Sequence, residues 1–285
     1  MSYGRTRPIL VGVDGSPESV TAARWAMAEA AMRQRPLQVA CVYAWPAPLM
    51  PLAGLPAELT EDSLREDAER IATDVVAAVR DAEPGVDVTP SAIIGLPAYK
   101  LIELSEHTTM VVVGHRGHGG FAALRLGSVA SNVAAHASCP VAVVRSAPDS
   151  AATRTVLVGV DGPRSSDPVL AFAFDEASRR NAELTALMAW ERPHKPTGPT
   201  VATWTAEAAH RLHGLLQPWH EQHPDVAIEQ RVSLESPARA LLDAARQAEL
   251  LVIGSRGRGG FPGLLLGSVS QQVIHYASGP VVVVR

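Results

Sequence analysis

The segment Ile9-Leu-Val-Gly-Val-Asp-Gly15 recurs in the second half of the chain as Val156-Leu-Val-Gly-Val-Asp-Gly162. A further pair of segments, 114–145 and 254–285, is identical at 19 of 32 positions without a gap. Chance would give about two identities at typical residue frequencies. Because both ends of each half repeat, the sequence indicates a duplicated domain. The length of 285 residues agrees with two domains at roughly 150 residues each.

Within each copy, short apolar runs alternate with longer helical stripes. Runs such as Val156–Val160 and Val281–Val284 are apolar without alternation, which is typical of parallel strands covered on both faces. We therefore predict an α/β fold with two tandem, doubly wound, five-stranded parallel sheets, Rossmann-like, each in the order 3-2-1-4-5. The domains are expected at 1–147 and 154–285.

In the first domain, strands are expected at Pro8–Val13, Leu37–Ala44, Val86–Ile94, Met110–Gly114 and Val141–Arg145. Helices are expected at Pro17–Arg33, over a stretch ending near Ala82, at Pro97–His107 and at Ser128–Ala137. Ser16 is expected to cap the first helix, since serine is favoured at that position and proline at the next. The second domain is expected to repeat this order.

Composition and charge exclude several classes of protein. Hydrophobic residues make up 47% and charged residues 19%, a profile typical of a folded, soluble protein. The net charge of −4 gives no general attraction to nucleic acid. No stretch approaches the roughly 20 apolar residues of a membrane span, and no signal peptide is readable. Two cysteines cannot build a disulfide framework, so we expect a cytoplasmic protein.

The loop after the fourth strand carries a repeated glycine pattern, Gly114-x2-Gly117-x9-Gly127-Ser128 and Gly254-x2-Gly257-x9-Gly267-Ser268. Glycine permits positive φ and close approach of backbone N–H groups to a ligand. The Gly-Ser pair opens a helix, whose N-terminal N–H groups favour an anion such as phosphate. We favour a phosphate-binding loop over a purely structural turn.

The first strand ends in Asp14, and its counterpart in the second domain ends in Asp161. Strands one and four flank the point where strand order reverses, which is where open parallel sheets bind ligands. Each carboxylate could therefore accept from ribose hydroxyls or hold Mg²⁺ through water. The alternative is a turn aspartate that caps its own backbone.

Better-known nucleotide motifs are missing. The only lysines, Lys100 and Lys195, follow no glycine, so the chain has no P-loop. No G-x-G-x-x-G occurs in the first strand–helix turn, which disfavours a dinucleotide site. The H-x-G-H of His115–His118 matches a nucleotidylyl transferase motif, but it follows the wrong strand and is absent from the second copy.

Other reactive or aromatic side chains have simpler explanations. The tryptophans are expected to pack rather than to stack on bases. His213, His220 and His223 share a helical face, which we interpret as solvated rather than as a metal site. Cys41 and Cys139 lack counterparts, so no paired redox role is implied. No nucleophile–base pair repeats, and we predict neither catalytic nor metal-ligating residues.

The strand-one aspartate and the G-x2-G-x9-G-[ST] loop, present in both halves, resemble the ATP-binding branch of the universal stress protein family in its tandem, actinobacterial form. The resemblance implies an adenine nucleotide alpha hydrolase-like fold. It also implies that the first-strand and second-strand residues contact adenosine, and that the loops and helix starts hold the phosphates of ATP. The implied ATP-binding residues are Gly12, Asp14, Val42, Gly114, His115, Arg116, Gly117, His118, Gly119, Gly120, Gly127, Ser128, Val129, Gly159, Asp161, Ala189, Gly254, Ser255, Arg256, Gly257, Arg258, Gly259, Gly260, Gly267, Ser268, Val269 and Ser270.

His115 and His118 depart from the residues found at 255 and 258. Phosphate affinity in the first site is therefore expected to depend on pH. The resemblance further implies pairing through the last strands, Val141–Val144 and Val281–Val284, and a homodimer of tandem chains.

Three functions follow as hypotheses. The first is a nucleotide-dependent stress sensor that takes about two ATP per chain and acts on an unknown regulatory protein partner. The second is a slow ATPase or phosphotransferase in which Asp14 or Asp161 places Mg²⁺. The third is a dimerisation module with vestigial loops. The sequence favours the first, because two binding loops repeat without a catalytic constellation.

Overall fold

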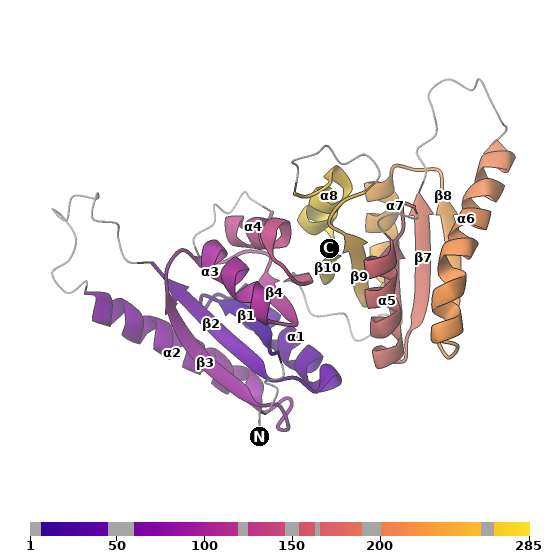
Figure 1. Ribbon diagram of the computed structural model, residues 1–285. Helices are drawn as coiled ribbons and strands as arrows, with labels where there is room; N and C mark the ends of the chain where they lie inside the picture. Colours follow the sequence, from indigo (N-terminus) through magenta and orange to yellow (C-terminus); the bar gives the residue numbers. More distant parts are fainter. Residues whose placement is uncertain are drawn as a thin grey trace. The chain divides into compact units, whose positions relative to one another are not determined.

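The computed structural model describes residues 7–44, 60–118, 125–145, 154–162, 166–189, 201–257 and 265–285. The chain divides into two compact units, Met1–Arg145 and Ser146–Arg285. Each unit contains a sheet with helices on both faces (Figure 1). Among the described residues, no helix combines the length and the apolar character that a membrane crossing requires.

The sheet of the first unit is entirely parallel, as predicted. Its strands are β1 (Ile9–Val13), β2 (Leu37–Tyr43), β3 (Val88–Ile94), β4 (Met110–Gly114) and β5 (Val141–Val144). They lie in the order β3-β2-β1-β4-β5, which confirms the predicted order. The order reverses between β1 and β4, so the residues after these two strands meet at one edge of the sheet.

Two pairs of helices cover the first sheet. They are α1 (Pro17–Arg33), α2 (Glu61–Arg80), α3 (Pro97–Leu104) and α4 (Ser128–His136). Helix α1 packs against α2, and α3 packs against α4. The helix predicted at Pro97–His107 ends earlier, at Leu104, and continues as a 3₁₀ turn, η1 (Ser105–His107).

Ser16 caps α1 as predicted, since its Oγ accepts a hydrogen bond from the N–H of Ser19. Helix α1 ends where Gln34 takes a left-handed conformation, with φ of 52°. Its counterpart Asn181 does the same in the second unit, with φ of 48°. The start and the end of the helix are therefore set by local residues.

The second unit repeats the arrangement. Its strands are β6 (Thr155–Gly159), β7 (Glu183–Ala189), β8 (Ile228–Ser233), β9 (Leu250–Gly254) and β10 (Val281–Val284). They are parallel and lie in the order β8-β7-β6-β9-β10. The helices are α5 (Asp167–Arg180), α6 (Val201–Gln222), α7 (Pro237–Ala244) and α8 (Ser268–Tyr276), with a 3₁₀ turn, η2 (Ala245–Gln247).

Each core holds a buried ion pair on its first helix. Glu29 pairs with Arg33 on α1 at 3.1 Å, and the corresponding Glu176 pairs with Arg180 on α5. The side chains of Glu29 and Glu176 are only 1% and 0% exposed. In the second unit the same arginine also contacts Glu249, with Nε and Oε1 3.1 Å apart. Burial of a charge is tolerated here because each carboxylate has a cationic partner.

Candidate functional site

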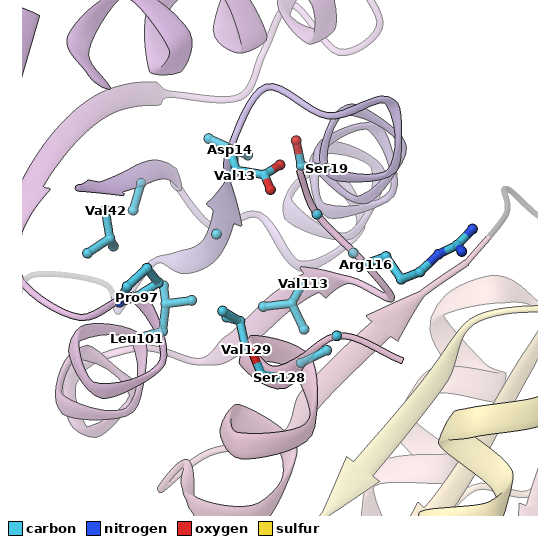
Figure 2. A pocket seen from close by; sticks show the side chains of 16 residues that line it. Val13, Asp14, Ser19, Val42, Pro97, Leu101, Val113, Arg116, Ser128 and Val129 are labelled. Atoms are coloured by element: carbon cyan, nitrogen blue, oxygen red, sulfur yellow. The ribbon is translucent and has the colours of Figure 1, made fainter. Parts of the chain in front are cut away.

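A cavity of about 500 Å³ opens at the edge of the first sheet where β1 and β4 end (Figure 2). Its wall combines strand ends, the start of α3 and the start of α4. The lining residues are Gly12, Val13, Asp14, Ser19, Ala40, Val42, Pro97, Leu101, Val113, Gly114, Arg116, Gly117, Gly127, Ser128, Val129 and Ala130. The cavity therefore lies at the switch point of the sheet, where the sequence predicted a ligand.

Nine of the residues proposed from the sequence line this cavity. They are Gly12, Asp14, Val42, Gly114, Arg116, Gly117, Gly127, Ser128 and Val129. His115 and His118 are not among the lining residues. Gly119, Gly120, Arg258, Gly259 and Gly260 lie outside the described residues.

Sequence reasoning missed most of the apolar part of the wall, beyond Val42 and Val129. Ala40 lies two residues before Val42 on β2, so the two share a face of the strand. Leu101 on α3 covers Gly12, where a Cβ atom would come within 2.7 Å of Leu101 Cδ1. Because side chains alternate between the two faces of β2, the prediction of Val42 could have been extended to Ala40. No local pattern marked Leu101, because its place depends on how α3 packs.

Asp14 caps its own turn and also reaches the glycine loop, the segment 114–127. Its Oδ1 accepts hydrogen bonds from the N–H and Oγ of Ser16, at 3.1 and 2.6 Å. Its Oδ2 accepts one from the N–H of His118, at 2.8 Å. The hydrogen bonds from Ser16 confirm the interpretation of Asp14 as a turn aspartate, and its contact with a ligand stays a prediction.

Opposing influences act on the ionisation of Asp14. Burial raises its pKa and is the largest single influence. The hydrogen bonds from Ser16, His118 and Ser19 lower it, and together they hold the pKa of Asp14 below its ordinary value. The group is therefore an anion at neutral pH, and it occupies one of the amide donors of the glycine loop.

Close approach, not positive φ, explains the glycine at position 117 of the loop. Positive φ occurs at Gly15, Gly95 and Gly162, and not at the described glycines of the two loops, so that part of the prediction was wrong. A Cβ atom at Gly117 would collide with Asp14 Oδ2. The absent side chain is what lets the carboxylate meet the next amide.

The loop closes on the start of α4 through the main chain. The N–H of Gly127 donates to the carbonyl of His115 at 2.7 Å. Gly127 is the N-cap residue of α4 and makes no side-chain cap hydrogen bond. Because Ser128, Val129 and Ala130 all line the cavity, the first turn of α4 faces it. The cavity is therefore adjacent to helix N-terminal amides, an arrangement that favours an anion.

His115 is buried beside the loop and stays neutral near pH 7. Burial lowers its pKa to about 4, with further contributions from the charges of Arg145 and Arg116, against an opposing effect of Glu18. Its Nε2 lies 3.2 Å from Arg116 Nε, which donates to it. The pH-dependent role expected for His115 near neutrality is therefore wrong, because a pKa of about 4 keeps it uncharged there.

The second unit has the same main-chain loop with different side chains. The N–H of Gly267 donates to the carbonyl of Ser255 at 2.8 Å, and a Cβ atom at Gly257 would collide with Asp161 Oδ2. Ser270 Oγ donates to the carbonyl of Gly254 at 2.7 Å. Gly159 and Ala189 end β6 and β7 at the corresponding positions. Ser268 and Val269 begin α8, and Arg256 follows the end of β9 by two residues.

Cys41, Trp219 and His223 are not among the residues that line the cavity, and Trp45 and Trp190 lie outside the described residues. Cys41 is buried, and burial followed by the charge of Asp14 raises its pKa to about 11, so little thiolate forms. His223 packs on Phe174 with ring centroids 5.5 Å apart, and Trp219 stacks on the same ring at 6.4 Å. Over the described parts of the chain, no three His, Cys, Asp or Glu side chains are grouped to hold a metal.

Comparisons of the sequence and of the structure with known proteins point to the same family. The sequence profile of the universal stress protein family matches residues 5–145 and 152–285. A universal stress protein of Mycolicibacterium smegmatis is 39% identical over 295 residues, covering 97% of this chain and 96% of its own. One of Mycobacterium tuberculosis is 40% identical over 291 residues, covering the same shares. The crystal structure of a universal stress protein from Archaeoglobus fulgidus matches with a TM-score of 0.71 at 21% identity, over 98% of this chain and 96% of that one, which supports the fold.

Proposed function

The chain belongs to the universal stress protein family, and from this we propose that it is an ATP-binding stress sensor. It takes ATP in the cavity of the first unit and at the corresponding loop of the second. It reports nucleotide state by changing its regulatory partner or its oligomeric state as a homodimer in the cytoplasm.

The observation that carries this proposal is that the cavity wall combines apolar side chains with backbone N–H donors. Apolar side chains of Val42, Pro97 and Leu101 lie together at one side of it in Figure 2. Ser128 and the described loop glycines Gly114, Gly117 and Gly127 line the same cavity and bring backbone N–H groups to it. A flat, largely apolar base suits the apolar side chains, and a chain of phosphates suits the backbone N–H groups. The volume of about 500 Å³ is within the usual range for ligand pockets.

Asp14 also lines the cavity, and it has a defined role in this proposal. Its carboxylate already accepts the N–H of His118. A phosphate that takes over this amide releases the carboxylate. The freed group is then placed to accept from ribose hydroxyls or to hold Mg²⁺ through water.

Slow hydrolysis of ATP is the second candidate function, and the position of Asp14 in the cavity wall favours it. Positioning of Mg²⁺ and phosphates alone allows slow turnover. Multiple-turnover hydrolysis that disappears in Asp14→Ala with Asp161→Ala would support an enzyme. Tight binding with no turnover above background would support the sensor.

The direct test is calorimetry of the nucleotide-stripped full chain with ATP, alongside mass spectrometry of small molecules released from freshly purified protein. Ser128→Glu puts a carboxylate at the exposed start of α4, where a phosphate is proposed to bind. We expect at least a tenfold loss of ATP affinity at the first site, since like charge replaces an attractive helix N-terminus. Ser268→Glu makes the matched change in the second unit.

Asn132→Glu is the control, because it adds the same charge to α4 one turn beyond Ser128, at a residue that does not line the cavity. It should leave ATP affinity within about twofold, since helix-terminus effects fade after the first turn. Absence of ATP binding by the unaltered protein would refute the proposal. Equal loss in Ser128→Glu and Asn132→Glu would refute the phosphate position.

A further inference from the structure

A glycine lies at the centre of the cavity wall that the sheet of the first unit provides. Gly12 of β1 pairs with Ala40 of β2 and with Val113 of β4. Residues that pair directly across a parallel sheet point to the same face, and all three line the cavity. Leu101 of α3 covers this glycine. The sheet wall, as we call it, is therefore a strip of backbone at Gly12 with Ala40 on one side and Val113 on the other.

The second unit has the same glycine but a larger neighbour on the second strand. Gly159 of β6 pairs with Leu187 of β7. Because Gly12 pairs with Ala40 in the same way, Leu187 takes the place of Ala40 on the same face of the sheet. Leu187 is only 5% exposed. A branched leucine therefore fills space beside the glycine that an alanine leaves open in the first unit.

The fourth strand of the second unit also carries a larger residue. Ile253 of β9 stands where the first unit has Val113, and it is one methylene larger. A Cβ atom built at Gly159 would lie 3.4 Å from Ile253 Cγ2, so this side chain reaches the same strip of backbone. Leu241 of α7 covers Gly159, with 3.1 Å between its Cδ2 and that Cβ position. Because the glycine and the covering leucine are kept, the side chains beside the glycine set the width of the space.

One difference between the units acts in the opposite direction. Val42, two residues beyond Ala40 on β2, corresponds to the smaller Ala189 on β7. Two residues along a strand span about 6.5 Å, so the smaller side chain frees space at the end of the strand and not beside Gly159. The second unit is therefore narrower beside its glycine and wider at the strand end.

We propose that position 40 and its counterpart 187 set the size of the base that each unit accepts. With Ala40, the first unit accepts the two fused rings of a purine. With Leu187, the second unit binds ATP more weakly and prefers a purine over a single-ring pyrimidine much less. This inference rests on the proposed function, because it requires a base at the sheet wall and phosphates at the loop. One extra methylene in an apolar pocket is worth about 10- to 200-fold in affinity, and leucine adds more than one to alanine.

Calorimetry with ATP and CTP on single-site chains tests the inference. Ser268→Glu leaves the first site to be measured, and Ser128→Glu leaves the second. We expect the first site to bind ATP about tenfold or more tightly than CTP, and the second to bind the two nucleotides within about threefold of each other. Equal ATP affinities and equal preferences at the two sites would overturn the inference.

Transfer of the leucine to the first unit should transfer the preference. In the Ser268→Glu chain, Ala40→Leu should lower ATP affinity about tenfold or more, while CTP affinity changes by less than about threefold. Ala40→Val should give an intermediate loss. Inorganic triphosphate is the control probe, because it has no base, and its affinity should stay within about twofold. An unchanged ratio of ATP to CTP affinity in Ala40→Leu would contradict a size limit at this position.

The reverse variant does not add volume to a packed wall. In the Ser128→Glu chain, Leu187→Ala opens the space beside Gly159 and should raise ATP affinity several-fold, with little change for CTP. If Ala40→Leu also loses inorganic triphosphate, which would indicate a disturbed fold, this variant decides, and an unchanged ratio of ATP to CTP affinity would overturn the inference. Failure of the unaltered chain to bind either nucleotide would instead refute the proposed function.

Discussion

The two units hold the same main chain at the switch point and surround it with different side chains. In both, the N–H of the glycine that caps the next helix, Gly127 or Gly267, donates to the carbonyl of the residue after the strand, His115 or Ser255, at 2.7 or 2.8 Å. A buried histidine and a small serine thus support the same closure. The comparison teaches that main-chain hydrogen bonds close the loop in both units, while the side chains beside it are free to differ.

The largest expected difference between the units concerns their buried ion pairs. Arg180 serves Glu176 and Glu249, whereas Arg33 is paired with Glu29, and Thr109 stands at the position of Glu249. We expect Arg180→Met to lower the free energy of unfolding of the second unit by about 3–5 kcal/mol, because it removes the cation from buried acids. Arg33→Met should cost the first unit less.

Hydrogen exchange of core amides in β1 and β6 measures the two units separately. The double variant Glu176→Gln with Arg180→Met is the control, and it should recover part of the loss, since no unpaired charge remains at position 176. Equal or greater destabilisation by Arg33→Met would contradict the interpretation.

The next difference appears on acidification. His115 has its pKa lowered from the usual 6.5 to about 4. Between these pH values His115 is protonated in the unfolded chain but neutral in the folded unit. The contribution of His115 to the free energy of unfolding is therefore fully present above pH 6.5, and it falls as the pH drops towards 4. We expect the first unit to lose on the order of 1–3 kcal/mol over this range relative to His115→Ser, which installs the residue of the second unit.

Thermal unfolding and hydrogen exchange from pH 7.5 to 4.5 test this expectation. The core amides of β6 provide the internal control, because the second unit has Ser255 at this position. Parallel pH profiles for the unaltered chain and His115→Ser would show that His115 does not carry the effect.

The smallest expected difference lies on the outer surface of the third helix of each unit. Tyr99 on α3 is 66% exposed, and its counterpart Arg239 on α7 has only exposed partners, Glu235 and Asp243, at 3.7 and 3.8 Å. Exchanging the residues, Tyr99→Arg or Arg239→Tyr, should change the free energy of unfolding by less than about 0.5 kcal/mol. Chemical denaturation measures it, and a change above about 1 kcal/mol would reveal a structural role for this surface.

The fold could be predicted from sequence because its signals are local. Apolar runs such as Val281–Val284 indicate buried parallel strands, and the Ser16-Pro17 pair marks the start of α1. These features depend on neighbours along the chain. The order of strands then follows from the limited set of doubly wound topologies.

The site could be predicted only in part, because its contacts join distant segments. The glycine spacing pointed to the loop, and Asp14 was correctly placed beside it. The bond from His118 to Asp14 spans 104 positions, and no local pattern encodes it. The burial that keeps His115 neutral is likewise a property of packing, which the residue type alone does not reveal.

The closure of each loop by peptide groups has a consequence for how the two copies can diverge. A hydrogen bond donated by a peptide N–H survives almost any substitution except proline. After duplication, each copy could therefore exchange the side chains around its loop while the main-chain scaffold stayed intact. One polypeptide thus carries two copies of the same closed loop, and the surroundings of each are free to diverge.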